Sequence, residues 1–220
     1  MSSSIQNPFL LINKPPGPTS HDIVNRVRRQ TGERRVGHAG TLDPFAEGLL
    51  IILVGRDATK RQAEFLGMDK TYEAVFRLGA TSTTEDPTGI ITERPNVDPF
   101  PEDLIKKTSA TFVGTHDQIP SAFSAKKIQG KKAYELARKG IQPDLKPKQI
   151  TIHAIEILNY QWPFLTIRTH VSSGTYIRAL ARDFGEKLGC GAYVETLKRT
   201  AIGPYLLNDA QRAEDIPCFS

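Results

Sequence analysis

The sequence has few cysteines, one tryptophan and no long apolar run. Its two cysteines, Cys190 and Cys218, have neither CxxC spacing nor neighbouring histidines, so neither a zinc site nor a disulfide framework is predicted. The longest apolar run, Leu49–Val54, is far too short to cross a bilayer, and the first residues lack the cationic and apolar segments of a secretory signal. These absences predict a soluble protein of the cytoplasm.

Basic residues outnumber acidic ones in the chain. Lys and Arg total 29 against 24 Asp and Glu, which gives a net charge of +5 and a pI near 9.2. This balance suits a polyanionic partner such as a nucleic acid, although a solvated basic surface without a partner explains the charge equally well. The 220 residues suffice for a sizeable core, and no repeat or long linker divides them.

Two helices are predicted from apolar periodicity and end signals. The first begins at Thr19 or Ser20 and ends before Gly32, after a last turn rich in arginine. The second spans about residues 175–188 and stops at Gly189. Each helix presents one apolar stripe and one face that carries arginines.

Several segments read as strands. The continuous apolar run Leu49–Val54 lies between glycines, which is typical of a strand covered on both faces. Apolar residues alternate with polar ones over Tyr72–Leu78 and Leu165–Val171, and Ile150–Ile152 repeats the pattern. Strands of this period, without regular alternation of strand and helix, predict an antiparallel or mixed sheet.

The remaining segments read as turns, loops and one short helix. A hairpin is predicted over residues 125–132, with its turn at 129–130, and a short helix over 133–139. The proline-rich segments 95–101 and 143–147 are predicted to be loops.

The densest candidate for chemistry is the segment Val36–Gly48. Three glycines and a proline within thirteen residues indicate a shaped loop next to a buried strand, where catalytic groups are often found. Asp43 directly precedes Pro44, so its backbone is biased towards an extended conformation. An Asp-Pro pair alone is more often a turn or a cap than a nucleophile, and His38 alone makes a poor metal site.

Two further segments carry candidate groups. In Val171–Arg178 a strand passes through a glycine turn into a helix whose first backbone amides could face an anion. The positive charge of Arg178 is repelled by the positive end of the helix dipole, and a carboxylate such as Asp43 would offset this repulsion. The alternative is that Arg178 is simply solvated. Tyr72 begins an alternating strand, where a tyrosine usually packs in the core.

Short motifs along nearly the whole chain resemble, in the same order, those of the TruB family of tRNA pseudouridine synthases. The matching segments are Leu10–Ser20, Gly37–Pro44, Lys70–Glu73, Leu78–Gly89, Ser124–Ala125, Tyr134–Gly140 and Gly174–Arg178. The resemblance implies an α+β fold with a mixed, mainly antiparallel sheet, flanking helices and an active-site cleft that crosses the sheet.

The resemblance also assigns three catalytic positions. Asp43 matches the catalytic aspartate, Arg178 its salt-bridge partner, and Tyr72 the tyrosine beneath the target base. A carboxylate serves either as a nucleophile at the glycosidic carbon or as a base at the sugar, and the sequence does not choose between these routes.

Other residues match positions that bind or support the substrate. His38 corresponds to the residue that helps to hold the everted nucleotide, Tyr176 to the aromatic of the last motif, and Leu197 to a residue of the uridine pocket. Lys14 and Pro15 match supporting positions of the first motif.

The reaction implied by the resemblance is conversion of uridine to pseudouridine at position 55, in the T arm of tRNA. It is an isomerisation without redox change, so neither a cofactor nor a metal is expected. The expected protein is a cytoplasmic monomer without an obligatory protein partner. Residues 1–220 are expected to form a single catalytic domain, without the C-terminal PUA-like domain found in many relatives.

Two other functions are compatible with the same residues. One is a non-catalytic RNA-binding module or tRNA chaperone, and the other is a guide-RNA-dependent synthase of the dyskerin type. The complete set of Asp43, Tyr72 and Arg178 argues against the first, and the absence of long basic tails argues against the second. Ser121 stands where the family usually has a proline, which predicts altered loop packing without loss of catalysis.

Overall fold

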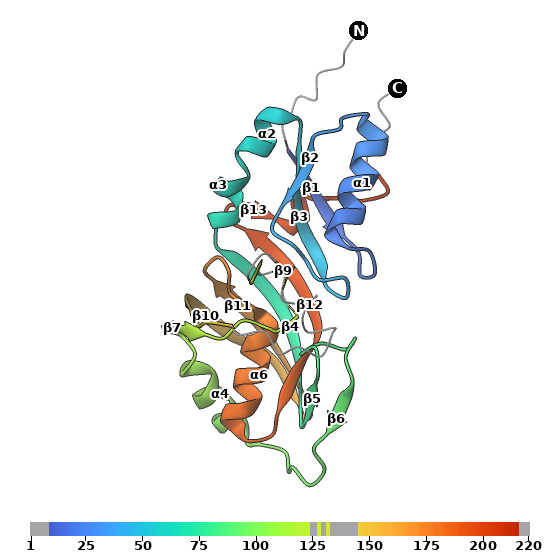
Figure 1. Ribbon diagram of the computed structural model, residues 1–220. Coiled ribbons are helices and arrows are strands. Elements are labelled where there is room, and N and C mark those ends of the chain that lie inside the picture. The colour runs from blue at the N-terminus through green and yellow to red at the C-terminus, as the bar shows by residue number, and fades with distance from the viewer. Residues whose placement is uncertain (1–8, 124–126, 129–130, 133–144, 216–220) are drawn as a thin grey trace. The chain divides into compact units, whose positions relative to one another are not determined.

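The computed structural model describes most of the chain (Figure 1). The described residues are 9–123, 127–128, 131–132 and 145–215. Within these ranges, every helix is too short or too polar to span a membrane.

The chain divides into two compact units. Unit 1 comprises Met1–Glu73 and Leu197–Ser220, and unit 2 comprises Ala74–Thr196. Two strands, β4 (Lys70–Leu78) and β12 (Ala192–Ile202), contribute residues to both units. Strand pairs are mostly antiparallel and helices flank the strands, so the predicted α+β fold is confirmed.

In unit 1 the strands pair around β3 (Glu47–Val54), and helices lie on both faces of that strand. Its other elements are β1 (Phe9–Lys14), α1 (Ser20–Thr31), β2 (Val36–Ala39), β3 (Glu47–Val54), α2 (Arg56–Lys60), α3 (Gln62–Gly67), β13 (Tyr205–Leu206), the 3-10 helix η1 (Leu207–Asp209) and β14 (Gln211–Arg212). Both β1 and β2 pair antiparallel with β3, whereas β14 runs parallel to β1. The last part of β12 runs parallel to the start of β3.

Strand β3 is the centre of unit 1, and both of its faces are buried. Leu50, Ile52 and Val54 pack in a core with apolar residues of α1. The opposite face packs against α2 and α3 with Leu49, Ile51 and Leu53. Figure 1 shows α1 on one side of β3 and α2 with α3 on the other. The predicted strand covered on both faces is confirmed, and it gives the segment that precedes it a rigid base.

Helix α1 has the ends that its sequence predicts. The Thr19 side chain accepts a hydrogen bond from the backbone N–H of Asp22, while the Asp22 carboxylate accepts one from the backbone of Thr19. Gly32 ends the helix with φ of 69°, in the left-handed region that favours glycine.

Unit 2 is built on a second group of antiparallel strands. Its other elements are β5 (Ala80–Ser82), β6 (Ile91–Glu93), α4 (Glu102–Ala110), β7 (Gly114–Gln118), β8 (Lys127–Ile128), β9 (Lys131–Lys132), β10 (Lys148–Gln161), β11 (Phe164–Val171) and α6 (Ile177–Leu188). The strand order is β4-β11-β10-β7. The predicted alternation is confirmed in β4 and β11, where every second side chain is buried.

Aromatic side chains join α6 to its neighbours in unit 2. The Phe184 ring of α6 stacks on Phe112 at 5.6 Å between centroids, and it meets the edge of Phe76 from β4 at 6.0 Å. Helix α6 begins at Ile177, slightly later than predicted, because Tyr176 has extended backbone angles. It ends before Gly189, as predicted.

The hairpin expected over residues 125–132 is confirmed by the antiparallel pairing of β8 with β9. Its turn at 129–130 and the helix expected over 133–139 lie outside the described residues. The expected loop over residues 95–101 has no regular structure. The expected loop over 143–147 is described only from residue 145 onwards, where it too is irregular.

Candidate active site

Asp43 lies in a loop of residues 40–46 that connects β2 to β3, called the Asp43 loop below. The side chain of Leu42 is buried, with 3% of its surface exposed, whereas Asp43 is only partly buried. At Gly48, just after the loop, an added Cβ would lie 2.3 Å from the backbone oxygen of Arg199. This close approach, together with φ of 110°, requires glycine there.

The buried hydroxyl of Ser20 holds the residue before Asp43. Ser20 Oγ donates a hydrogen bond to the Leu42 carbonyl at 3.0 Å and accepts one from the Leu42 N–H at 2.9 Å. One side chain of α1 therefore satisfies both backbone polar groups of Leu42.

The buried guanidinium of Arg199 holds the start of the Asp43 loop. Arg199 Nε donates to the Leu49 carbonyl at 2.8 Å, and Nη2 donates to the Gly40 carbonyl at 3.0 Å. Nη1 lies 3.5 Å from the Thr41 carbonyl. Only 1% of the Arg199 surface is exposed.

The ammonium group of Lys14 holds the residue after Asp43. Its Nζ donates to the carbonyls of Pro15, Pro18 and Pro44 at 2.8, 2.9 and 3.3 Å, and its side chain is fully buried. Burial lowers the pKa of Lys14 to about 8, and the negative charge of Asp43 opposes this shift. The charges of Lys14 and Asp43 therefore interact, and each favours the ionised form of the other.

His38 lies on β2, and its ring is mostly enclosed. The His38 carbonyl accepts a hydrogen bond from Gln62 Nε2 at 2.7 Å, while Nδ1 is buried and has no hydrogen-bond partner among the described residues. Burial lowers the pKa of His38, and the positive charges of Arg199 and His21 lower it further. The imidazole is therefore neutral at pH 7.

Tyr72 and Leu197 lie on strands of unit 1. Tyr72 is on the buried face of β4 and Leu197 is on β12, with 9% and 7% of their surfaces exposed. Lys14, His38 and Asp43 belong to unit 1 as well, whereas Tyr176 and Arg178 belong to unit 2. The predicted salt bridge between Asp43 and Arg178 stays a prediction.

Arg178, in the first turn of α6, is 4% exposed, so the alternative of a solvated side chain is wrong. Its Nη1 donates to the Thr84 carbonyl at 2.9 Å, and its Nη2 donates to the Phe123 carbonyl at 3.0 Å. Ser121 Oγ lies 3.3 Å from Nη1, so the serine that replaces the expected proline contacts a predicted catalytic residue. Loop carbonyls thus fix the guanidinium.

A buried carboxylate of the same unit also faces Arg178. Asp86 Oδ2 lies 3.4 Å from Arg178 Nη1. The other carboxylate oxygen of Asp86 accepts hydrogen bonds from Thr84 Oγ1 at 2.6 Å and from the Thr88 N–H at 2.9 Å. A fixed carboxylate next to a buried guanidinium offsets part of its desolvation cost.

Tyr176 precedes α6 and is held by Gln118. Gln118 Nε2 donates to the Tyr176 carbonyl at 3.1 Å, and Gln118 Oε1 accepts from the Tyr176 N–H at 2.9 Å. This reciprocal pair matches the one between Ser20 and Leu42 in unit 1. In both places one buried polar side chain fixes the backbone close to a predicted catalytic residue, Asp43 in unit 1 and Arg178 in unit 2.

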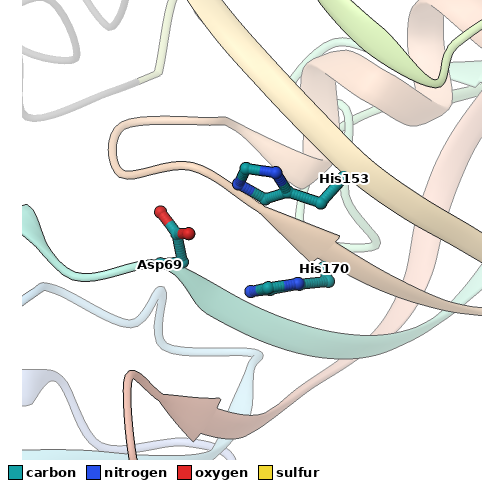
Figure 2. A group of neighbouring side chains, drawn as sticks. All are labelled: Asp69, His153 and His170. Carbon is teal, nitrogen blue, oxygen red and sulfur yellow. The ribbon is translucent and has the colours of Figure 1, made fainter.

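The described residues include one histidine pair with the spacing of metal ligands. His153 on β10 and His170 on β11 have ring centroids 4.7 Å apart, and both are exposed (Figure 2). Figure 2 also labels Asp69, which belongs to unit 1. We assign this pair no role in the candidate site.

Sequence reasoning missed the roles of Ser20, Arg199, Asp86 and Gln118. Two of them had a signal. Ser20 lies three and four residues before Ile23 and Val24, so it falls on the buried stripe of α1. Arg199 lies two residues after Leu197, so both face the same buried side of β12. A polar residue on a buried face needs partners, although periodicity does not say which.

Two family models match the chain. "TruB family pseudouridylate synthase (N terminal domain)" matches residues 28–177, and "tRNA pseudouridylate synthase B C-terminal domain" matches residues 178–218. Among curated proteins, tRNA pseudouridine synthase B of Protochlamydia amoebophila is 45% identical over 94% of this chain and 79% of its own length. The protein of the same name from Parabacteroides distasonis is 43% identical over 98% of this chain and 94% of its own.

A solved structure is similar as well. One chain of the crystal structure of a Cbf5-Nop10-Gar1 complex superposes with a TM-score of 0.73 and 27% identity over 94% of this chain. This chain spans about half (52%) of that chain's length. The family match, the relatives and the described fold agree, and the chain belongs to the TruB family of pseudouridine synthases.

Proposed function

We propose that the protein converts uridine to pseudouridine at position 55 in the T arm of tRNA, with Asp43 as the catalytic carboxylate. The observation that carries the proposal is the 45% identity to a tRNA pseudouridine synthase B over 94% of the chain. The geometry of the Asp43 loop adds support, because it presents a partly buried carboxylate from a fixed backbone.

The reaction moves one bond and exchanges one proton. The bond between N1 of the base and C1′ of the ribose breaks, the base turns over, and a bond forms between C5 and C1′. The proton leaves C5 and N1 regains one, so atoms and electrons balance without a redox partner. A carboxylate suffices for the step at the sugar, either as nucleophile at C1′ or as base.

The surroundings of Asp43 suit this chemistry. The Lys14 ammonium is protonated below pH of about 8, and its electrostatic attraction favours an ionised Asp43. In the proposal Arg178 adds a second positive charge and Tyr72 lies beneath the base.

In this proposal the flipped nucleotide is bound by His38, Leu197 and Tyr176. The base must leave its stack to reach a carboxylate, at a cost of a few kcal/mol that stacking and polar contacts offset. Because burial keeps His38 neutral, it suits stacking or hydrogen bonding to the nucleotide better than pairing with a phosphate.

We further infer that the protein acts as a cytoplasmic monomer without a guide RNA. One curated relative named tRNA pseudouridine synthase B is 45% identical, whereas the chain in the Cbf5-Nop10-Gar1 complex is 27% identical and about twice as long. These figures favour a stand-alone tRNA enzyme over a guide-dependent one. A non-catalytic chaperone is the other alternative, and the same assay distinguishes all three.

The test uses purified protein and unmodified tRNA transcript labelled with tritium at C5 of uridine. Formation of the new bond releases this tritium, so its release measures product. The proposal predicts release of one equivalent per tRNA from the full transcript, little or none when cytidine replaces uridine at position 55, and turnover of the isolated T-arm hairpin. Tight binding without release supports the chaperone, and release only after a guide RNA and partner proteins are added supports the dyskerin type.

A further inference from the structure

We propose that Ser20 and Arg199 are positioning residues, which hold the backbone around Asp43 in the geometry that its reaction requires. The inference rests on the proposed function and assigns roles to two side chains that the predicted catalytic set leaves out. Both are polar, both are almost fully buried, and both bind backbone atoms of the segment from Gly40 to Leu49.

The contact of Ser20 fixes the peptide plane that leads into Asp43. The Leu42 carbonyl and the Asp43 nitrogen belong to one planar peptide group. Ser20 Oγ binds that carbonyl at 3.0 Å and the Leu42 N–H, which belongs to the preceding peptide group, at 2.9 Å, so the peptide planes on both sides of Leu42 are held. The buried Leu42 side chain adds a third point of attachment.

The peptide plane after Asp43 is fixed as well. The Asp43 carbonyl accepts a hydrogen bond from the Ala46 N–H at 3.1 Å, and the Pro44 carbonyl accepts one from the Gly17 N–H at 2.8 Å. Lys14 binds the Pro44 carbonyl too. Both peptide planes that flank Asp43 are therefore held, so the backbone from which its carboxylate projects is fixed.

Arg199 ties the two ends of the Asp43 loop to each other. Its guanidinium binds the Gly40 carbonyl at the start of the loop and the Leu49 carbonyl in β3, beyond its end. Burying a cation is costly, and the donors of this one go to backbone carbonyls at either end of the loop. A buried arginine whose donors go to loop carbonyls is therefore better explained by the shape of the loop than by stability.

Arg199 also contributes charge. Burial is the main cause of the lowered pKa of Lys14 and of His38, and the positive charge of Arg199 lowers both further. Loss of this charge would change the electrostatic environment of the loop as well as its shape. The expected consequence is a slower chemical step, since misplacement of a reacting group by about 1 Å costs on the order of a hundredfold in rate.

The experiment compares Ser20→Ala and Arg199→Met with Val24→Ala. Val24 lies on the same helix as Ser20 and is 1% exposed, so its truncation destabilises α1 without touching the Asp43 loop. Single-turnover rate, tRNA affinity, melting temperature and hydrogen exchange of the Leu42 amide are measured for each variant. Arg199→Lys tests rescue, because a lysine keeps the charge and one or two of the hydrogen bonds.

We expect Ser20→Ala and Arg199→Met to lower the single-turnover rate about 10- to 100-fold while tRNA affinity stays within about twofold. Leu42 amide exchange should rise about tenfold or more in Ser20→Ala, because its acceptor is gone. Arg199→Lys should recover part of the rate. Val24→Ala should melt earlier yet keep the wild-type rate well below its transition.

Two results overturn the inference, and they differ from failure of the proposed function. If the wild-type protein is active and both variants keep its rate, or lose rate only in proportion to melting temperature as Val24→Ala does, neither residue positions Asp43. If the wild-type protein forms no pseudouridine, the proposed function fails and the positioning role falls with it.

Discussion

Asp43 and Arg178, the two charged residues of the predicted catalytic set, are held in different ways. The structure fixes Asp43 through its neighbours, since Ser20 and Lys14 bind the backbone on either side of it. It fixes Arg178 through the guanidinium itself, which binds the carbonyls of Thr84 and Phe123. The carboxylate is partly exposed and the guanidinium is 4% exposed.

This difference predicts which substitutions affect the reaction rate more than the folding stability. Changes at Ser20 or Arg199 alter the position of a partly exposed group, so they should lower the rate by more than their effect on folding stability explains. Changes at Arg178 leave buried polar groups without partners, so they should reduce both.

The largest expected effect follows replacement of Arg178 by methionine. Arg178→Met leaves the carbonyls of Thr84 and Phe123 and one oxygen of Asp86 without the guanidinium, so we expect a loss of about 3–5 kcal/mol in the free energy of unfolding. Urea denaturation measures it. Arg168→Met is the control, because Arg168 is half-exposed in a surface ion pair with Glu156 and should cost under about 1 kcal/mol. Equal losses of stability in the two variants would contradict the account in which the buried contacts of Arg178 stabilise the fold.

A smaller effect is expected at Gln118. Gln118→Leu leaves the N–H and carbonyl of Tyr176 without their partner, which should cost about 1–3 kcal/mol and fray the start of α6. Urea denaturation and hydrogen exchange of the first α6 amides are the measurements. Gln149→Leu, at an exposed position of β10, is the control and should change neither stability nor exchange. Equal effects in both variants would show that the hydrogen bonds between Gln118 and Tyr176 are unimportant.

The third prediction concerns Lys14 and pH. Its pKa is about 8 in the folded protein against 10.5 for an ordinary lysine, so between these values the unfolded chain binds more protons. Stability should therefore rise from pH 8 towards 10.5, by at most about 1.4 kcal/mol per pH unit from this group.

Carbon NMR of labelled lysine tests the assignment directly. The Lys14 Cε signal should titrate near pH 8, whereas that of Lys106, whose pKa is raised by its ion pair with Glu102, should titrate above 10.5. A Lys14 midpoint at the ordinary lysine value would contradict the buried ammonium beside the Asp43 loop.

The smallest effect is expected at His38. Its pKa lies below the ordinary value of 6.5, so the unfolded chain takes up a proton first as pH falls. The contribution of His38 to stability is constant above pH 6.5. It declines as pH falls from 6.5 through the lower pKa of the folded state. His38→Gln should remove this part of the decline, measured as urea midpoints from pH 7 to 5. An identical decline in both proteins would mean that His38 is accessible and unshifted.

Local patterns predicted the elements that carry the site. Six apolar residues between glycines predicted β3, and alternation predicted β4, because burial of one face or both leaves a direct mark on the sequence. The motif order predicted the family, and the Asp-Pro pair marked the loop in which Asp43 lies. Assignment of Asp43 as the catalytic residue came from resemblance, since local chemistry left a turn or a cap open.

Long-range hydrogen bonds were not predictable from the sequence. Ser20 and Leu42 are 22 positions apart, and Arg199 lies about 150 positions from Leu49. The sequence predicted Ser20 only as a possible helix start and predicted no strand around Arg199, and many carbonyls are compatible partners until the fold brings one within reach. The same holds for Asp86, which was noted only as part of a motif and faces Arg178.

The central claim is that Asp43 carries the isomerisation, and comparison of Asp43→Asn with Asp57→Asn tests it most directly. Asp57 is an almost fully exposed carboxylate of α2 in the same unit, so the two variants make the same chemical change. Purified proteins are incubated with unmodified tRNA transcript, and pseudouridine is mapped along the RNA. The account predicts product at position 55 from wild type and Asp57→Asn, and none from a folded Asp43→Asn that still binds tRNA. Product from Asp43→Asn at the wild-type rate would contradict it.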